Sequence, residues 1–354
     1  MHETYMKRCL QLAANGEGLV EPNPMVGCVI VHGDKIIAEG FHHHYGSNHA
    51  EVDAINKLQG FDKFNECSLY VNLEPCSHTG KTPPCADLII EKKFKQVIIA
   101  QQDPNLLVAG KGIEKLKAAG IETINVRRGG CEAEALELNK RFNCFYQKNR
   151  PFVTLKWAQT ADDIIAPQMR DPNYQSLRYI SNQYSVRQVH RYRACHGAIL
   201  VGSNTALNDN PTLDVRHWEG KNPVRVVWDP QLRLNQDLNV FDGTTPTLVL
   251  VDQYFRSNKH WEKENVEFIY IDFSIGAAKQ TLEVLYNKGI QSLLVEGGRM
   301  VLQTFISENI WDETKVFTAP QKTYHTGLKA PFINQEPNYT ENISGDILKT
   351  YIHG

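Results

Sequence analysis

Long apolar segments are missing from this sequence of 354 residues, and their absence excludes a membrane-spanning architecture. No apolar run approaches the roughly 20 residues that a helix needs to cross a bilayer. The first residues, Met1-His2-Glu3-Thr4-Tyr5, also lack the apolar core of a secretory signal. We therefore expect a cytoplasmic protein with no membrane partner.

An excess of charge of either sign is also missing. Lys and Arg number 38 and Asp and Glu number 40, so the formal net charge at pH 7 is only −2. A surface that holds a phosphate backbone usually carries a marked excess of basic residues. We therefore expect small-molecule partners and no nucleic acid. The length, with 42% hydrophobic and 22% charged residues, is typical of a globular chain with room for two domains.

The eight cysteines are scattered along the chain, whereas a small secreted scaffold would concentrate them for disulfides. We expect most of them to be reduced core residues. Cys76 and Cys85 differ, because the segment between them, residues 77–84, is polar and contains Gly and Pro. Such a loop is a poor place for buried apolar side chains.

The first half of the chain alternates between helices and strands. Apolar periodicity predicts a helix over 4–14, and the turn His32-Gly33-Asp34 joins two short apolar runs into a predicted hairpin. Further helices are expected at 49–59, 85–93, 113–119 and 132–142, and strands at 26–31, 35–40, 68–73, 96–100 and 122–126. This alternation predicts a largely parallel sheet with helices on both faces.

A polar stretch from Gln147 to Pro151 interrupts the periodicity, and a new apolar run follows it directly. We place a domain boundary there, which gives domains of residues 1–147 and 151–354. In the second half, helices are expected at 185–194, 277–288 and 299–307, and strands at 152–157, 198–201, 224–228, 247–251 and 292–295. This half is therefore predicted to be a second α/β domain, and the polar tail after Lys322 yields no prediction.

Three residues of the first half have the chemistry of zinc ligands. His49 opens a predicted helix, Cys76 follows a predicted strand, and Cys85 opens the next helix. One imidazole and two thiolates leave a tetrahedral zinc ion with one open position, which is the pattern of catalytic rather than structural sites. A water molecule at such a position ionises near neutral pH. The sequence therefore predicts one catalytic zinc ion per chain, bound by His49, Cys76 and Cys85.

Glu51 follows His49 by two residues and is not expected to be a further ligand. A helix turns by about 100° per residue, so the two side chains diverge. A carboxylate beside a metal-bound water suits proton transfer from the water to the substrate. His-x-Glu followed by Pro-Cys is the arrangement of the zinc deaminases.

The spacing of the two cysteines is a separate signal. Nucleoside and nucleic-acid deaminases usually have two residues between the cysteines, whereas eight lie between them here, including His78 and Lys81. These two groups suit a phosphate or a ring carbonyl.

Three longer segments resemble one family. They are Glu21-Pro22-Asn23-Pro24-Met25-Val26-Gly27, Gly40-Phe41-His42 with His49-Ala50-Glu51, and Glu74-Pro75-Cys76 continued to Pro83-Pro84-Cys85. Together they are similar to the RibD family, bifunctional enzymes of riboflavin biosynthesis. The resemblance implies a cytidine-deaminase-like α/β/α domain followed by a dihydrofolate-reductase-like α/β domain. It also implies that Asn23, His42, His78 and Lys81 contact the deaminase substrate.

The activity that the resemblance implies has two steps. The first is zinc-dependent hydrolytic deamination of 2,5-diamino-6-(5-phosphoribosylamino)pyrimidin-4-one. The second is NADPH-dependent reduction of the ribosyl side chain to ribityl. A homo-oligomer, either a dimer or a tetramer, is also expected.

The second half alone carries a weaker signal. Gly297-Gly298 between a predicted strand and helix resembles a phosphate cradle, but no G-x-G-x-x-G is present, so a Rossmann domain is not indicated. By the family resemblance, the cofactor would contact Ala158, Tyr179, Thr205, Asp209, Pro230, Gly298, Arg299, Met300, Val301, Leu302, Gln303 and Thr304. The reductase substrate would contact Lys156, Arg193, Leu213, Arg216 and Glu296. The chain departs from the family pattern at Asp163, Leu177, Tyr179 and Asn210.

Two alternatives remain open at this point. One is a nucleoside or tRNA-type zinc deaminase fused to an unrelated α/β domain, which the cysteine spacing and the lack of a basic surface disfavour. The other is a zinc-stabilised binding module without turnover. The open zinc position and Glu51 favour an enzyme over such a module.

Overall fold

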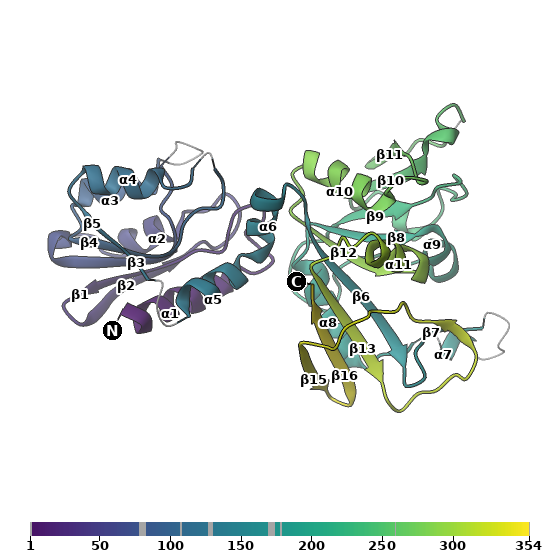
Figure 1. The fold of residues 1–354 in the computed structure, drawn as a ribbon. Helices are drawn as coiled ribbons and strands as arrows, with labels where there is room; N and C mark the ends of the chain where they lie inside the picture. The colour runs from purple at the N-terminus through teal and green to yellow at the C-terminus, as the bar shows by residue number, and fades with distance from the viewer. Residues whose placement is uncertain are drawn as a thin grey trace. The chain divides into compact units, whose positions relative to one another are not determined.

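The chain divides into two compact units, Met1–Asn149 and Arg150–Gly354. A computed structural model describes residues 2–77, 83–106, 108–126, 130–168, 174–177, 179–258 and 260–353. Figure 1 shows that each unit is built on its own sheet with helices packed against it.

The first unit has a five-stranded sheet in the order β2-β1-β3-β4-β5. The strands are β1 (Gly27–His32), β2 (Lys35–Phe41), β3 (Cys67–Leu73), β4 (Gln96–Gln101) and β5 (Glu122–Asn125). The helices are α1 (His2–Ala13), α2 (Ala50–Asn56), α3 (Cys85–Lys92), α4 (Lys111–Ala118), α5 (Cys131–Leu138) and α6 (Lys140–Lys148). The predicted hairpin is confirmed as β1 and β2. Since β1 runs antiparallel to both of its neighbours, only β3, β4 and β5 are parallel.

Alternate side chains of β1 enter two separate cores, because successive residues of a strand face opposite sides of the sheet. Cys28 and Ile30 pack with residues of α2, α3 and α4, and Val29 and Val31 pack with residues of α1 and α5. Figure 1 shows these two groups of helices on opposite faces of the sheet. The expected layering of helix, sheet and helix is therefore confirmed.

The single helix predicted over 132–142 is instead two helices that meet at Asn139. This residue leaves the helical conformation (φ −101°, ψ 23°) and is buried. Its side chain accepts a hydrogen bond from the N–H of Met25 at 2.8 Å and donates one to the carbonyl oxygen of Met25 at 3.0 Å. The break therefore serves to hold the segment around Met25, which residue periodicity in the helix does not reveal.

The second unit has a nine-stranded sheet in the order β11-β10-β9-β8-β12-β6-β13-β16-β15, and a separate pair, β14 and β7. The strands are β6 (Phe152–Thr160), β7 (Ile164–Pro167), β8 (Ala198–Gly202), β9 (Val224–Trp228), β10 (Thr247–Asp252), β11 (Val266–Ile271), β12 (Ser292–Gly297), β13 (Glu313–Ala319), β14 (Gly327–Lys329), β15 (Tyr339–Ile343) and β16 (Asp346–Ile352). The helices are α7 (Tyr174–Leu177), α8 (Gln183–Ala194), α9 (Ser203–Asp209), α10 (Ala277–Asn287) and α11 (Arg299–Ser307). The strands from β11 to β13 are parallel, so the predicted α/β character of this half is confirmed.

The tail for which the sequence yields no prediction completes this sheet. β16 pairs antiparallel with β13, and β15 pairs with β16. Asp346, Leu348 and Thr350 of β16 are buried, with less buried residues between them. Two of these three residues are polar, so the alternation is not visible as a hydrophobic pattern.

The helices in the described part of the chain are short. The longest, α1 and α8, have 12 residues each, and none has the length and hydropathy that a bilayer-spanning helix requires.

Candidate active site

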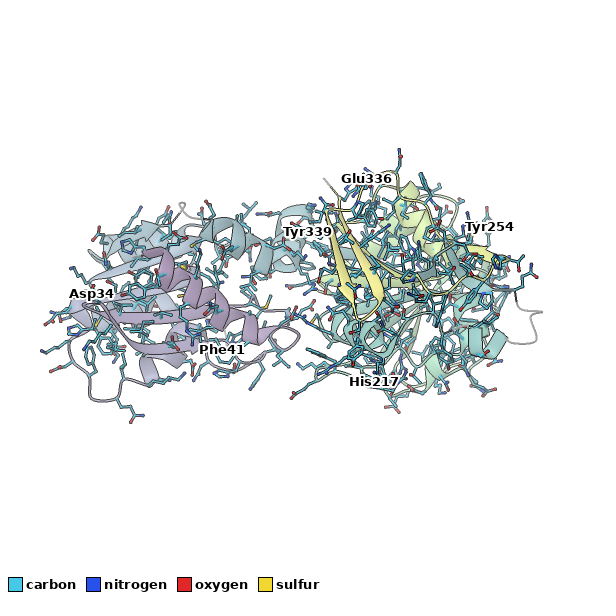
Figure 2. All side chains as sticks on the ribbon, turned by 90° about the horizontal axis from the view of Figure 1, so that it is seen from below. Asp34, Phe41, His217, Tyr254, Glu336 and Tyr339 are labelled. Atoms are coloured by element: carbon cyan, nitrogen blue, oxygen red, sulfur yellow. The ribbon has the colours of Figure 1, made fainter. Side chains whose placement is uncertain are left out.

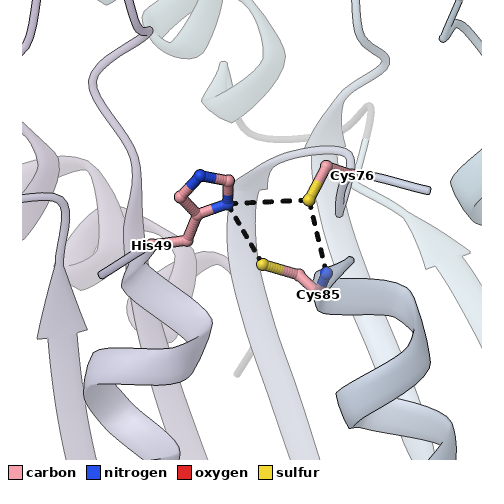
Figure 3. A group of neighbouring side chains, drawn as sticks. All are labelled: His49, Cys76 and Cys85. Carbon is pink, nitrogen blue, oxygen red and sulfur yellow. Dashed lines mark hydrogen bonds between the residues drawn. The ribbon is translucent and has the colours of Figure 1, made fainter. Parts of the chain in front are cut away.

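His49, Cys76 and Cys85 converge at the carboxyl end of β3. His49 stands just before α2, Cys76 follows β3 and Cys85 opens α3. Nδ1 of His49 lies 3.6 Å from Sγ of Cys76 and 3.3 Å from Sγ of Cys85, and the three donor atoms all lie within 4.8 Å of one another. Figure 3 shows the three side chains directed toward a common point. The structure therefore brings together the three predicted ligands.

The donor set fits a zinc ion in both chemistry and spacing. Thiolate and imidazole together favour zinc among the common divalent metals. Tetrahedral coordination at ~2.0 to 2.3 Å separates neighbouring ligand atoms by roughly 3.5 to 3.8 Å, close to the spacing observed here. Hydrogen bonds from Cys85 and His49 lower the pKa of Cys76 well below its usual value, so one thiolate is already favoured. Among the described residues, this is the one group of His, Cys, Asp or Glu side chains with the spacing of a metal site.

Gly40 allows α2 to approach the sheet closely enough to place His49. A Cβ atom at this position would lie 2.4 Å from the carbonyl oxygen of Ala50 and 2.5 Å from the N–H nitrogen of Ala54. No side chain fits at those distances, so glycine sets the spacing between β2 and α2. The start of α2 is thereby held against the sheet, beside the loop that carries Cys76.

Glu51 lies in the first turn of α2 and is buried, with 3% of its surface exposed. Without a metal ion, burial raises the pKa of its carboxyl to about 7, the charge of Cys76 acts in the same direction, and His49 opposes it. The thiol of Cys85 is its hydrogen-bonding partner. The residue therefore lies beside the ligand cluster, with a carboxyl that both binds and releases a proton near neutral pH.

A cavity of about 350 Å³ opens beside these residues. Asn23 and His42, both predicted to contact substrate, line it together with His49, Glu51 and Cys76. Nδ1 of His42 lies 2.9 Å from the carbonyl oxygen of Asn48, so it carries the ring proton, and Nε2 accepts from the amide of Asn23 at 3.0 Å. Burial lowers the pKa of His42, which keeps the ring neutral. Since the amide nitrogen of Asn23 is bound to His42, its oxygen remains as the acceptor for a ligand.

His78 and Lys81, the other two predicted contacts of the deaminase substrate, lie outside the described residues.

Glu74 is a residue of this site whose role sequence reasoning missed. Its buried carboxylate accepts four backbone hydrogen bonds, from the N–H groups of Asp103, Gly110, Gly112 and Ile113, at 2.8 to 3.2 Å. The segment that it gathers contributes Asp103, Asn105 and Val108 to the cavity wall. The signal in the sequence is a charged residue at the end of an apolar strand, next to the predicted ligand Cys76.

A second cavity, of about 770 Å³, lies in the second unit at the ends of β6, β8 and β12. The predicted cofactor contacts that line it are Ala158, Tyr179, Thr205, Asp209, Pro230, Gly298, Arg299, Met300, Val301, Leu302 and Thr304. Gln303 is not among the lining residues, because its side chain is turned toward Ser307 and the N–H of Phe332. It lies on a different face of α11 from its predicted neighbours.

Two glycines shape this cavity where α11 begins. A Cβ atom on Gly298 would lie 3.1 Å from Oγ1 of Thr205, and one on Gly202 would lie 2.8 Å from a methyl group of Val301. The N-terminus of α11, a helix of nine residues, is thereby exposed to the cavity beside α9. A helix N-terminus offers free N–H groups to an anion.

The five predicted contacts of the reductase substrate are in four different situations. Lys156 and Glu296 line the second cavity. Arg193 lies behind them and forms a two-pronged ion pair with Glu296 at 2.7 and 2.9 Å. Leu213 is buried in the apolar core, and Arg216 is exposed on the following loop.

The charges of Lys156, Glu296 and Arg193 form a buried triad. Burial alone would raise the pKa of Glu296, but Arg193 and Lys156 lower it to about 2. Nζ of Lys156 lies 3.5 Å from Glu296, and burial lowers the pKa of this lysine. Glu296 is therefore a fixed anion at the cavity floor.

Comparison with known proteins matches both units. The profile of the cytidine and deoxycytidylate deaminase zinc-binding region matches residues 1–101, and that of the RibD C-terminal domain matches residues 151–323. Riboflavin biosynthesis protein RibD of Aquifex aeolicus is 39% identical over 322 residues, 90% of this chain and 87% of the relative. RibD of Escherichia coli is 33% identical over 333 residues, 90% of this chain and 88% of the relative. The chain belongs to the RibD family.

Solved structures agree with this assignment. The diaminohydroxyphosphoribosylaminopyrimidine deaminase/5-amino-6-(5-phosphoribosylamino)uracil reductase of Thermotoga maritima has a TM-score of 0.87 at 37% identity, with 100% of this chain and 99% of that chain covered. RibD of Acinetobacter baumannii has a TM-score of 0.86 at 30% identity, again with 100% and 99% covered. The predicted family and fold class are therefore confirmed. The alternative in which the second domain is unrelated to RibD is wrong, since that domain matches the RibD C-terminal profile.

The positions at which the chain departs from the RibD pattern are accommodated locally. Asp163 and Asn210 have positive φ angles, 60° and 42°. Asn and Asp are the non-glycine residues that adopt this conformation most readily. Asp163 accepts from the amide of Gln159 at 2.6 Å, and Asn210 accepts from the N–H of Asn239 at 2.7 Å. Leu177 accepts a hydrogen bond from Tyr324 through its carbonyl oxygen, and Tyr179 lies at the cavity edge with 63% of its surface exposed.

Proposed function

We propose that this chain catalyses two successive steps of riboflavin biosynthesis. The first replaces an amine of 2,5-diamino-6-(5-phosphoribosylamino)pyrimidin-4-one with a carbonyl, consuming water and releasing ammonia. The second reduces C1 of the opened ribose with NADPH to give the ribityl side chain. Residues 1–147 would form the deaminase domain and residues 151–354 the reductase domain. The observation that carries the proposal is the convergence of His49, Cys76 and Cys85 beside Glu51 in a chain of the RibD family.

In the deaminase site, His49, Cys76 and Cys85 would hold the zinc ion. Bound zinc supplies the positive charge that makes a water molecule nucleophilic at neutral pH. The carboxylate of Glu51 would take one proton from a water molecule and deliver it to the ring nitrogen. It would then pass the second proton of that water to the departing amine, which leaves as ammonia. Its position suits this role, since the buried carboxyl lines the same cavity as His49 and Cys76.

Asn23 and His42 would orient the pyrimidine. The amide oxygen of Asn23 accepts from an N–H group of the substrate, and neutral His42 fixes the rotation of that amide. The small cavity excludes bulk water around the reacting carbon. His78 and Lys81 are proposed to contact the ring and the phosphate from the loop between the cysteines.

In the reductase site, the larger cavity would hold NADPH, whose nicotinamide supplies the hydride equivalent. The glycine-lined N-terminus of α11 suits the pyrophosphate, since side chains at Gly202 and Gly298 would meet Val301 and Thr205. Thr205, Asp209 and Tyr179 would line the cofactor. Glu296, with Lys156 beside it, would face the sugar, and Arg216 would bind the phosphate.

The proposal also covers the binding partners, the location and the assembly of the protein. The net charge of −2 supports a small-molecule enzyme that does not bind nucleic acid. A cytoplasmic location and a homo-oligomeric assembly, either dimer or tetramer, complete the proposed function.

The test follows both products from one purified protein. With the diaminopyrimidine substrate and no NADPH, one equivalent of ammonia should be released and the ribosyl group should persist. Addition of NADPH should then convert the intermediate to the ribityl compound, with one NADPH oxidised for each product. Ammonia release without any NADPH oxidation would refute the reductase half, and no ammonia from the zinc-loaded protein would refute the deaminase half.

A further inference from the structure

The loop that carries Arg216 is docked onto α8 by two hydrogen bonds of opposite direction. The backbone N–H of Arg216 donates to Nδ1 of His190 at 3.0 Å, and Nη1 of Arg193 donates to the carbonyl oxygen of Asp214 at 3.1 Å. His190 and Arg193 are three residues apart on α8, so they lie on the same face of the helix. His190 accepts a hydrogen bond from the loop and Arg193 donates one to it. Together the two bonds fix the position and the register of the loop on α8.

His190 is a buried and uncharged acceptor. Only 3% of its surface is exposed. Because the N–H of Arg216 points at Nδ1, that nitrogen carries no proton, and the ring proton is on Nε2. Burial lowers the pKa of His190 to about 4, helped by Arg193 on α8 and by His217 and Arg216 on the loop, while Glu296 on β12 acts in the opposite direction. The ring therefore stays neutral throughout the physiological range.

His217, the residue after Arg216, contacts the ring of His190. The two rings meet edge to face, with 4.7 Å between their centroids. His217 itself is exposed, and Figure 2 shows it at the surface of this unit. His190 is thus in contact with an exposed aromatic ring of the same loop.

The same loop directs the side chain of Arg216. Nη1 donates to Oγ1 of Thr212 at 2.6 Å and to a carboxylate oxygen of Asp214 at 2.7 Å. The Arg216 side chain remains 53% exposed, so it is open to a ligand while its direction is set. Leu213 anchors the start of the loop, with a positive φ of 56° and a side chain in the core.

We propose that His190 is a positioning residue that holds the Arg216 loop in place to bind the phosphate of the reductase substrate. The inference rests on the proposed reductase function, and it adds a residue that touches neither substrate nor cofactor. Loss of the acceptor leaves the N–H of Arg216 without its partner, releases the loop from α8 at one of its two bonds, and so weakens the grip on the phosphate. The geometry of the hydride-transfer step should stay unchanged when His190 is replaced.

The experiment compares His190→Leu with the unaltered full-length protein. With the deaminated phosphoribosyl compound as substrate, KM should rise about tenfold with little change in kcat, as expected when a charge-assisted contact is made equally in the ground state and the transition state. KM for NADPH should stay the same. Binding of inorganic phosphate, measured by calorimetry in the absence of substrate, should weaken by a similar factor. The phosphate measurement separates this inference from the proposed function, because it needs no turnover.

Two further variants give the controls. His190→Asn places an amide oxygen near the position of Nδ1 and should restore most of the affinity for substrate and phosphate. His196→Leu removes another histidine of this unit with 3% exposure, which bonds to Tyr192 and Thr154 instead of the loop. It should lower the melting temperature and leave both affinities unchanged. Unchanged phosphate binding in folded His190→Leu, or an equal loss in His196→Leu, would overturn the proposal.

Discussion

Glu51 is the single residue on which the proposed deamination depends most. Glu51→Gln keeps the shape of the side chain and removes its basic oxygen, so deamination should fall by roughly 10² to 10⁴, the usual cost of lost general acid-base catalysis. The zinc content should stay at that of the unaltered protein, because Glu51 is not among the three converging ligands. Ammonia release and metal analysis on the same preparation provide the check. A variant that deaminates at the normal rate, or that loses its zinc, would contradict the assigned role.

His190 should make the free energy of unfolding depend on pH, and replacing this residue should remove that dependence. The pKa of this histidine falls from the ordinary 6.5 to about 4 in the folded protein. Between these values the unfolded chain takes up a proton that the folded chain does not, so stability decreases as pH falls from about 6.5 toward 4. Between pH 7 and pH 4.5, the free energy of unfolding should therefore fall by about 2 to 3 kcal/mol more in the unaltered protein than in His190→Asn. Urea unfolding of both proteins at the two pH values measures this difference, and equal losses would show that His190 titrates normally.

At the residue scale, the sequence reveals those functional residues whose side chains act directly, for example by binding a metal ion. The sequence predicts His49, Cys76 and Cys85 as zinc ligands because imidazole and thiolate are preferred zinc donors and their positions next to predicted elements suit a metal site, and the structure brings them together. Glu74 and His190 could not be found in this way, since each acts by accepting N–H groups from segments distant in sequence. Arg193 shows a further limit. Its charge suits a phosphate, yet in the structure both prongs of its guanidinium meet Glu296.

At the scale of elements, the loop from Asp103 to Gly112 depends on one carboxylate. In Glu74→Gln, an NH₂ group replaces one oxygen and faces two backbone donors where it should accept. The free energy of unfolding of the first unit should fall by about 3 kcal/mol, since buried donors lose a charged acceptor. The KM for the deaminase substrate should also rise, because this loop lines the cavity.

Glu39→Gln is the matched control. Glu39 pairs with Arg8 on the same unit near the surface, and such a pair contributes about 0 to 1 kcal/mol.

Urea unfolding and ammonia-release kinetics measure the two effects of the Glu74 change. An unchanged KM in a folded Glu74→Gln protein would mean that the loop keeps its place without the carboxylate. A loss of stability in Glu39→Gln as large as that in Glu74→Gln would show that the effect is not specific to the buried site.

The elements that the sequence predicts are those whose burial follows a hydrophobic period. The hairpin of β1 and β2 and the helices α3, α8, α10 and α11 are of this kind. The break at Asn139 and the strand β16 were missed for a common reason, which is that polar side chains fill the buried positions. The side-chain amide of Asn139 is hydrogen-bonded to the backbone of Met25. Asp346 of β16 accepts hydrogen bonds from Ser185 and Asn182 at the start of α8.

At the scale of the whole molecule, each unit has its own core and its own cavity, so the two activities should respond separately to substitution. Arg193→Ala leaves Glu296 buried with Lys156 as its remaining cation, and removing one partner of a buried ion pair costs about 3 to 5 kcal/mol. NADPH oxidation on the deaminated substrate should therefore fall steeply, while ammonia release from the first substrate stays normal. Both rates are measured on one preparation. A parallel loss of ammonia release would show that the units are not independent.

Removal and return of zinc test the central claim most directly. Chelation should abolish ammonia release from the full-length protein, and one equivalent of zinc per chain should restore it, while NADPH oxidation on the deaminated substrate is unchanged throughout. Cys76→Ser should bind less than one equivalent and should not recover, because it replaces a thiolate by a weaker ligand. Ammonia release that persists in the metal-free protein, or a full equivalent of zinc held by Cys76→Ser, would contradict the account.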